Sequence, residues 1–185
     1  MPKDKPQILQ RQETHLSPWS SVMARTLVMP GKSGAEDFHS LRQADYVSVL
    51  AVTADGRVPL VRQYRPALEQ HTLELPGGLR DGNEAPELAA LRELSEETGL
   101  KATAAPHALG CLAPDTGRLE NRLWGFMMHV ETDTTPDWTP EPGIERLMVP
   151  RAELREWILS GKFDHALHIA LIGMALIHGV FELER

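Results

Sequence analysis

Residues 78–100 read GLRDGNEAPELAALRELSEETGL, and the spacing of the apolar and acidic residues in this stretch decides the fold. The run from Asn83 to Gly99 predicts a helix, because Asn83 is a favourable N-cap and Gly99 a favourable stop. Pro86 falls in the first turn, where its missing N–H costs little. With about 3.6 residues per turn, one stripe of leucines is expected to face the core: Leu88, Leu91 and Leu94.

The same helix gathers carboxylates on another face. Glu93, Glu96 and Glu97 stand at i, i+3 and i+4, which are neighbouring positions on a helix surface. Like charges this close repel, and each raises the pKa of its neighbours unless a cation lies among them. Carboxylate oxygens suit Mg²⁺, which binds through a few carboxylates and substrate phosphates. The pattern favours a magnesium site over the alternative, an acidic face that is solvated.

The helix is preceded by a short predicted strand. Residues 71–79 read HTLELPGGL, an extended run that ends in a Pro-Gly-Gly turn. Glycines in such a turn allow the backbone to approach a ligand closely.

Nine positions between Gly78 and Leu100 fit the pattern Gx5Ex7REUxEExGU, in which U is a bulky aliphatic residue. This is the Nudix box, and over about residues 45–180 the chain resembles the Nudix hydrolases. The resemblance implies an α/β fold, an α/β/α sandwich around a mixed β-sheet. It implies a site for Mg²⁺, which Mn²⁺ can replace, built from the carbonyl of Gly77 and the side chains of Glu93, Glu96 and Glu97.

Four further residues of the box are implied to be structural: Gly78, Glu84, Arg92 and Gly99. Glu84 and Arg92 are expected to pair and to position the helix. The alternative is that both are surface charges.

Nudix hydrolases cleave a nucleoside diphosphate linked to another group, so the resemblance implies attack by water on a diphosphate phosphorus. Glu97 and Glu93 are the first candidates for the catalytic metal ligands. In the ADP-ribose pyrophosphatase branch, the general base comes from a later acidic loop, which here offers Glu141 and Glu145. The alternative is that both are surface charges of this loop.

The substrate class is implied by segments outside the box. Residues 61–67 read VRQYRPA and residues 73–78 read LELPGG, and both are similar to segments of ADP-ribose and nucleotide-sugar pyrophosphatases, as is the position of Pro114. The implied reaction cleaves ADP-ribose, or a related nucleoside diphosphate sugar, to a nucleoside monophosphate and a sugar phosphate. Arg65 is expected to contact a phosphate or ribose, or alternatively to pair with Glu74.

Further residues are candidates for substrate binding. Arg118 or Arg122 is expected to reach the diphosphate, with solvated loop arginines as the alternative. Trp19 is expected to stack on the base, with a packing tryptophan as the alternative. The box also fits a hydrolase of another diphosphate, such as a nucleoside triphosphate, a dinucleoside polyphosphate or coenzyme A. A non-catalytic sensor of ADP-ribose is disfavoured, because the set of glutamates is complete.

Charge, cysteine content and hydrophobicity bear on the partners and the location of the protein. A net charge of −7 argues against a nucleic-acid partner, which calls for basic patches. Cys111 is the single cysteine, so no internal disulfide forms and a cytoplasmic location is expected. The first residues lack an apolar run, and residues 166–181 are too short to span a bilayer comfortably, so no membrane partner is expected. His165 and His168 lack an accompanying zinc ligand set and are expected to pack at a helix end.

The chain is expected to divide into an N-terminal extension, residues 1–44, and a hydrolase domain, residues 45–185. Within the extension, residues 24–29 and 37–42 predict a β-hairpin, and residues 1–12 are expected to be loose. The resemblance to the ADP-ribose branch implies a homodimer whose N-terminal strands exchange, and residues 13–45 have the length for this exchange. In the domain, Asp55-Gly56 predicts a hairpin between residues 46–52 and 58–64. Further strands are expected at 123–130 and 146–149, and helices at 151–159 and 166–181.

Overall fold

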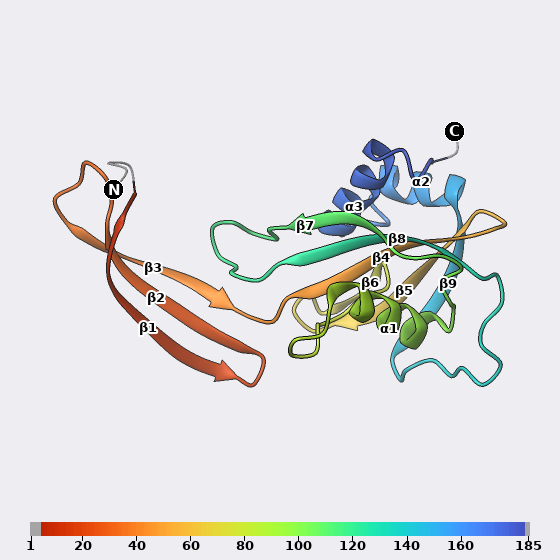
Figure 1. Ribbon diagram of the computed structural model, residues 1–185, viewed down its shortest axis with the longest axis horizontal. Helices are drawn as coiled ribbons and strands as arrows, with labels where there is room; N and C mark the ends of the chain where they lie inside the picture. The colour runs from red at the N-terminus through yellow and green to blue at the C-terminus, as the bar shows by residue number, and fades with distance from the viewer. Residues whose placement is uncertain (1–4, 184–185) are drawn as a thin grey trace. The chain divides into compact units, whose positions relative to one another are not determined.

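The computed structural model describes residues 5–183 (Figure 1). The chain forms two compact units. The first contains the residues up to Asp45 together with the returning segment Ala113–Arg122, and the second contains Tyr46–Leu112 and the chain from Leu123 onward. The segment 113–122 therefore belongs with the N-terminal strands, although it lies far from them in sequence.

The first unit is an antiparallel sheet in the order β1-β2-β3, with β1 Gln7–Ser17, β2 Ser20–Val28 and β3 Ala35–Arg42. β2 and β3 form the predicted N-terminal hairpin, in which Val28 lies opposite Ala35. The prediction of a loose N-terminus was wrong for residues 7–12, because β1 pairs with β2 along its length; residues 1–4 lie outside the described part. β1 is exposed throughout, so backbone pairing holds it and no apolar alternation marked it.

The returning segment joins this sheet through backbone and side-chain contacts. The N–H of Leu41 donates to the carbonyl of Arg118 at 2.7 Å, and the N–H of Glu120 donates to the carbonyl of Leu41 at 3.0 Å. The carboxylate of Glu120 pairs with Arg25 and, at 3.2 Å, with Arg42.

The second unit contains two sheets. In one, the order is β4-β8-β7, with β4 Tyr46–Thr53, β8 Leu123–Val130 and β7 His107–Leu112; β4 and β8 are parallel and β7 is antiparallel to β8. In the other, the antiparallel order is β6-β5-β9, with β5 Arg57–Arg65, β6 Gln70–Glu74 and β9 Ile144–Pro150. The hairpin predicted at Asp55-Gly56 was wrong, because β4 pairs with β8 and β5 with β6 and β9.

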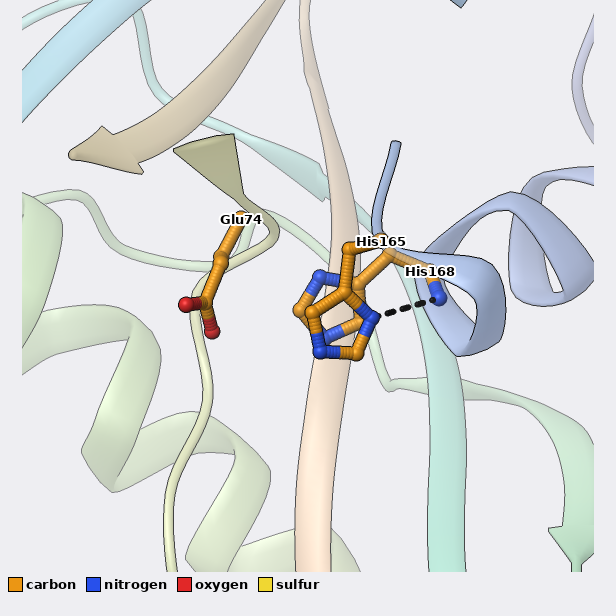
Figure 2. Close-up of side chains that lie close together, drawn as sticks. All are labelled: Glu74, His165 and His168. Atoms are coloured by element: carbon orange, nitrogen blue, oxygen red, sulfur yellow. Dashed lines mark hydrogen bonds between the residues drawn. The ribbon is translucent and has the colours of Figure 1, made fainter. Parts of the chain in front are cut away.

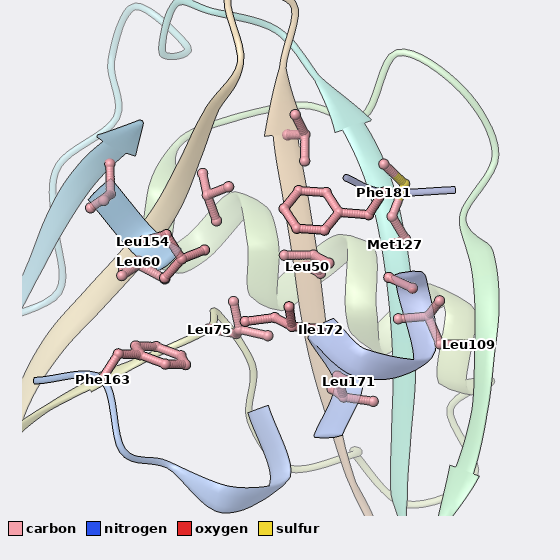
Figure 3. Close-up of a cluster of buried hydrophobic side chains, with 14 of the residues drawn as sticks. Leu50, Leu60, Leu75, Leu109, Met127, Leu154, Phe163, Leu171, Ile172 and Phe181 are labelled. Carbon is pink, nitrogen blue, oxygen red and sulfur yellow. The ribbon is translucent and has the colours of Figure 1, made fainter. Parts of the chain in front are cut away.

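Both faces of β4 are buried, and its residues 49–52 are apolar on both faces, as is typical of a strand between two cores. Leu50 and Val52 face one core, and Val49 and Ala51 face the other. The first core is covered by α2 Arg151–Ser160 and α3 Ala166–Ile177, and Figure 3 shows Leu171 and Ile172 of α3 packed near Leu50. The second is covered by α1 Pro86–Thr98 (Figure 1). The α/β/α sandwich with a mixed sheet is confirmed.

Details of α1 differ from the prediction. Its N-cap is Ala85 and makes no side-chain capping bond, so Asn83 does not cap it; Gly99 ends it in the left-handed conformation, with φ of 69°. Leu88 is 59% exposed, because the buried face is formed by Ala89, Ala90 and Leu94 and lies further round the helix. Small alanines let this face approach the sheet closely. Among the described residues, no helix is long and apolar enough to cross a membrane.

Candidate functional site

The second half of α1 directs two carboxylates toward the loop that follows β6. The side chain of Glu97 is buried, and its Oε2 accepts a hydrogen bond of 2.8 Å from the N–H of Gly77. Glu93 lies one turn earlier and faces Gly78, where a Cβ atom would lie 2.6 Å from the Glu93 carboxylate. A side chain at position 78 would therefore displace the Glu93 carboxylate from its place beside the loop.

The loop itself is an extension of the β4 sheet. The N–H groups of Val47 and Val49 donate to the carbonyls of Gly78 and Pro76, at 2.9 and 2.8 Å. A Cβ atom at Gly77 would collide with the backbone of β4. The loop is thus fixed against the sheet, and its N–H at Gly77 is held opposite Glu97.

The carboxyl groups of Glu93 and Glu97 have raised pKa values. Burial is the main cause that raises the pKa of Glu97 to about 7; the nearby carboxylates of Glu93 and Glu141 contribute to this rise, and the Gly77 hydrogen bond opposes it. Burial also raises the pKa of Glu93, although Arg92 opposes this. Buried carboxylates that repel one another favour either a proton or a bound cation. The donor set, carboxylate oxygens with a loop backbone beside them, fits a hard divalent cation.

Arg92 organises the exposed side of the same helix. Its Nη1 donates to Glu93 at 2.8 Å and to Glu96 at 3.0 Å. Its Nη2 donates to Glu84 at 3.0 Å and to the carbonyl of Leu79 at 3.1 Å. Hydrogen bonds from Arg92 lower the pKa of Glu84. The expected pair of Glu84 and Arg92 is present, and it joins the helix to the preceding loop.

Glu96 occupies a different environment from Glu93 and Glu97. Its side chain is 46% exposed and pairs with Arg92. A role for Glu96 as a metal ligand stays a prediction, as do those of Glu93, Glu97 and the Gly77 carbonyl.

Of the two loop glutamates, Glu141 is the one whose charge influences the glutamates of α1. The charge of Glu141 acts on both Glu93 and Glu97 and raises the pKa of each. Glu145 lies in β9 opposite Arg62 of β5, and its carboxylate accepts from that arginine at 3.0 Å with its side chain 61% exposed. The contact of Glu145 is a cross-strand ion pair on the surface.

The loop that carries Glu141 is attached to the C-terminal end of α1 by residues that sequence reasoning missed. The indole Nε1 of Trp138 donates to the carbonyl of Glu96 at 2.8 Å, and Arg146 donates to the carbonyl of Thr98 at 2.5 Å. The guanidinium of Arg146 lies 4.8 Å from the Trp138 ring centre. These contacts satisfy helix carbonyls that have no partner within the helix. In the sequence, the only sign of these contacts was the presence of a tryptophan in a polar loop.

A cavity of about 210 Å³ adjoins Glu97. On its wall, Arg65 forms a bidentate pair with the buried Glu74, at 2.7 and 2.6 Å. The structure thus shows the alternative expected for Arg65, and a contact between Arg65 and substrate stays a prediction.

Two histidines from the start of α3 line the same cavity. Their rings stack with centres 3.7 Å apart. Figure 2 shows both rings beside Glu74. The i, i+3 spacing of His165 and His168 was visible in the sequence, but Glu74 lies about ninety positions away and could not be assigned to them from spacing alone.

The other predicted substrate residues belong to the first unit. Trp19 lies in the turn between β1 and β2 and is 73% exposed. Arg118 lies in the returning segment, where its backbone pairs with Leu41. Contacts of Trp19 and Arg118 with substrate stay predictions.

The sequence is similar to a known family and to curated proteins. The family model for the NUDIX domain matches residues 42–169. An ADP-sugar pyrophosphatase of Mus musculus is 46% identical over 122 residues, which cover 61% of this chain and 56% of that protein. An ADP-ribose pyrophosphatase of Mycobacterium tuberculosis is 31% identical over 147 residues, covering 72% of this chain and 65% of that protein. The chain thus spans less than two thirds of the length of these curated relatives.

A crystal structure of an ADP compounds hydrolase superposes with a TM-score of 0.77. The two chains are 21% identical, and the match covers 96% of this chain and 97% of the other. At this identity the likeness establishes a shared fold.

Proposed function

Since this chain belongs to the family defined by the NUDIX domain, we propose that it is a Mg²⁺-dependent pyrophosphohydrolase. Its substrate is ADP-ribose or a related nucleoside diphosphate sugar, and its products are a nucleoside monophosphate and a sugar phosphate. The names of the mouse and M. tuberculosis relatives support this substrate class. The observation that carries the proposal is the buried Glu97, held against Gly77 and surrounded by the charges of Glu93 and Glu141.

Glu93, Glu96, Glu97 and the carbonyl of Gly77 would hold Mg²⁺, or Mn²⁺ in its place. When bound, the cation supplies charge neutralisation at the diphosphate and lowers the pKa of the attacking water. Arg92 keeps Glu93 and Glu96 oriented and joins them to the Leu79 carbonyl. Gly77 donates to Glu97, which leaves the other carboxylate oxygen free to bind.

Glu141 is the proposed general base. It lies close enough to Glu93 and Glu97 to shift their pKa values, and its side chain is exposed, so water and substrate can reach it. Glu145 is disfavoured because Arg62 occupies its carboxylate. Glu141→Gln is expected to lower kcat by about 10²-fold, as for loss of a general base. Glu145→Gln is the matched control and is expected to change kcat less than about twofold. Equal losses in both variants would contradict the assignment.

The substrate class is tested by product analysis with the purified protein and Mg²⁺. ADP-ribose and ADP-sugars are expected to yield AMP and a sugar phosphate. Nucleoside triphosphates, dinucleoside polyphosphates and coenzyme A are expected to be poorer substrates by kcat/KM. Preference for one of these would replace the proposed substrate, and binding of ADP-ribose without turnover would indicate a sensor.

We also propose that the protein is a homodimer assembled through residues 1–44. Support comes from β1, an edge strand that is exposed along its whole length and carries exposed apolar residues: Ile8, Leu9 and Leu16. An unpaired strand edge is a ready template for pairing with another chain. Analytical ultracentrifugation of the full chain at micromolar concentration is expected to give twice the monomer mass, and a monomer would contradict the proposal.

A further inference from the structure

The cavity beside Glu97 contains a buried donor that the chain itself does not use. His168 is 4% exposed, and its Nδ1 accepts a hydrogen bond of 3.0 Å from the N–H of Leu75. Because Nδ1 accepts, the neutral imidazole carries its proton on Nε2. Within the described residues this Nε2–H has no hydrogen-bond partner, and His168 lines the cavity.

His165 repeats the arrangement. Its Nδ1 accepts from the N–H of His168 at 3.4 Å, as the dashed line in Figure 2 marks, so its proton also lies on Nε2. The two rings stack in parallel within 11°. The structure therefore presents two neutral N–H donors side by side, in the cavity that Glu97 also lines.

A metal ion fits this cluster poorly, although ligand atoms of Glu74, His165 and His168 lie within 4.8 Å of one another. A histidine that binds metal through one ring nitrogen normally donates a proton from the other. Here the other nitrogen of each ring faces a backbone N–H and cannot donate to it. Glu74 in addition already accepts three hydrogen bonds from Arg65 and Thr72, so its carboxylate has one lone pair left.

The remaining groups of the cavity include both donors and acceptors. Gln63 supplies an amide, Oε2 of Glu74 retains one lone pair beside its bond to Arg65, and the histidines supply N–H groups. Hydroxyl groups can donate and accept at once, so they match this mixture better than a phosphate, which only accepts and which Glu74 and Glu97 would repel. The volume of about 210 Å³ corresponds to about seven water molecules, enough for one sugar ring and too little for a nucleotide.

We propose that this cavity binds the sugar of the nucleoside diphosphate sugar, with Nε2–H of His165 and His168 donating to its hydroxyl groups. This inference rests on the proposed function, because it assigns one half of that substrate. Glu97 on the cavity wall places the sugar next to the diphosphate that is cleaved.

The test measures equilibrium binding by calorimetry with magnesium withheld. Two ligands are compared: ADP-ribose and the β-methyl ester of ADP, which keeps the diphosphate diester and lacks the sugar. Wild type is expected to bind ADP-ribose more tightly. His165→Asn and His168→Asn keep an acceptor at the Nδ1 position and remove the Nε2 donor. Each is expected to reduce the advantage of ADP-ribose about three- to tenfold, as for one lost hydrogen bond, without changing the affinity for the methyl ester.

His165→Gln places an amide near the Nε2 position and is expected to retain most of the advantage. His178→Asn, on the far end of α3 where His178 contacts His107, is the matched control. His165 is only half-buried, so its variants remain informative even if His168→Asn does not fold. Equal affinity of wild type for both ligands, or equal weakening of both in His165→Asn, would overturn the proposal. So would a tight Zn²⁺ site that His165→Asn removes.

The outcomes separate this inference from the proposed function. If wild type prefers ADP-ribose over the methyl ester but does not hydrolyse it with Mg²⁺, the sugar site stands and the proposed reaction fails. If it hydrolyses ADP-ribose without this preference in binding, the reaction stands and the sugar site fails.

Discussion

Glu74 and Glu97 are both buried and line the same cavity, yet the pKa values of their carboxyl groups move in opposite directions. Burial raises the pKa of Glu74, but hydrogen bonds from Arg65 and Thr72 outweigh it and bring that pKa to about 2. Burial and, to a smaller extent, neighbouring carboxylates raise the pKa of Glu97 to about 7. The same residue type therefore serves the fold where a cation of the protein pairs with it, and is available for chemistry where none does.

The largest expected effect comes from neutralising Glu97, with which no cation among the described residues pairs. Glu97→Gln keeps the volume of the side chain and removes a charge that would face the metal and diphosphate. We expect hydrolysis to fall by a factor of about 10²–10³, as for loss of one strong electrostatic contact in a dry site. The measured quantities are kcat with saturating Mg²⁺ and the melting temperature. Full activity in a folded Glu97→Gln protein would remove the basis of the metal assignment.

Neutralising Glu74, which pairs with Arg65, is expected to lower the stability of the fold. Glu74→Gln leaves Arg65 without its bidentate partner, and Arg65 is 44% exposed, so the cost is smaller than for a fully buried pair. We expect the free energy of unfolding to fall by about 2–3 kcal/mol in urea titrations. The exposed pair of Arg62 and Glu145 provides the control, because Glu145→Gln is expected to cost less than about 1 kcal/mol. A Glu74→Gln protein as stable as wild type would show that the pair contributes nothing.

The difference between wild type and Glu74→Gln should depend on pH. The folded pKa of Glu74, about 2, is below its ordinary value of 4.5, so the unfolded chain binds the proton first. The stabilisation is therefore fully present above pH 4.5 and is lost as pH falls from 4.5 toward 2. Unfolding free energies of the two proteins are expected to converge over this window by at most about 3 kcal/mol. A constant difference from pH 7 to pH 2.5 would contradict the pairing.

A smaller effect is expected where the Glu141 loop meets α1. Trp138→Leu removes the hydrogen bond to the Glu96 carbonyl and the contact with Arg146. The loop should then hold Glu141 less accurately, and kcat is expected to fall about tenfold with KM little changed. Trp157→Leu, in α2 beside Lys162, is the matched control for losing a tryptophan. If KM rises and kcat stays constant, the loop binds substrate and does not position the base.

The positions of the site glutamates could be predicted because they depend on one local regularity, the helical period. Glu93 and Glu97 lie a turn apart whatever packs around them. Leu88 shows the limit of the same reasoning, since which stripe of α1 is buried depends on the close approach of Ala89 and Ala90 to the sheet. For Arg65 the sequence left two partners open, the carboxylate of Glu74 and a group of the substrate. Spacing alone does not choose between a carboxylate and a phosphate.

Contacts between distant segments could not be predicted. Asp55-Gly56 is a strong local hairpin signal, but pairing of β4 is decided by β8, about 75 positions along the chain. The strand β1 carries mostly polar residues and is ordered by backbone pairing with β2, which composition does not reveal. Likewise, Glu74 and Leu75 lie beside the stacked rings of His165 and His168 only in the folded protein, so their contacts with these histidines could not be read from the sequence.

The hydrogen bonds that join residues 76–78 to β4 have a consequence for the motions of the protein. The amides of Val47 and Val49, which bond to the carbonyls of Gly78 and Pro76, lie on a strand whose side chains fill both cores. Their exchange with deuterium requires opening of the whole α/β/α unit, so it should be as slow as any in the molecule. The turn opposite Glu97 thereby shares the rigidity of the protein interior, although it lies beside a cavity open to ligand.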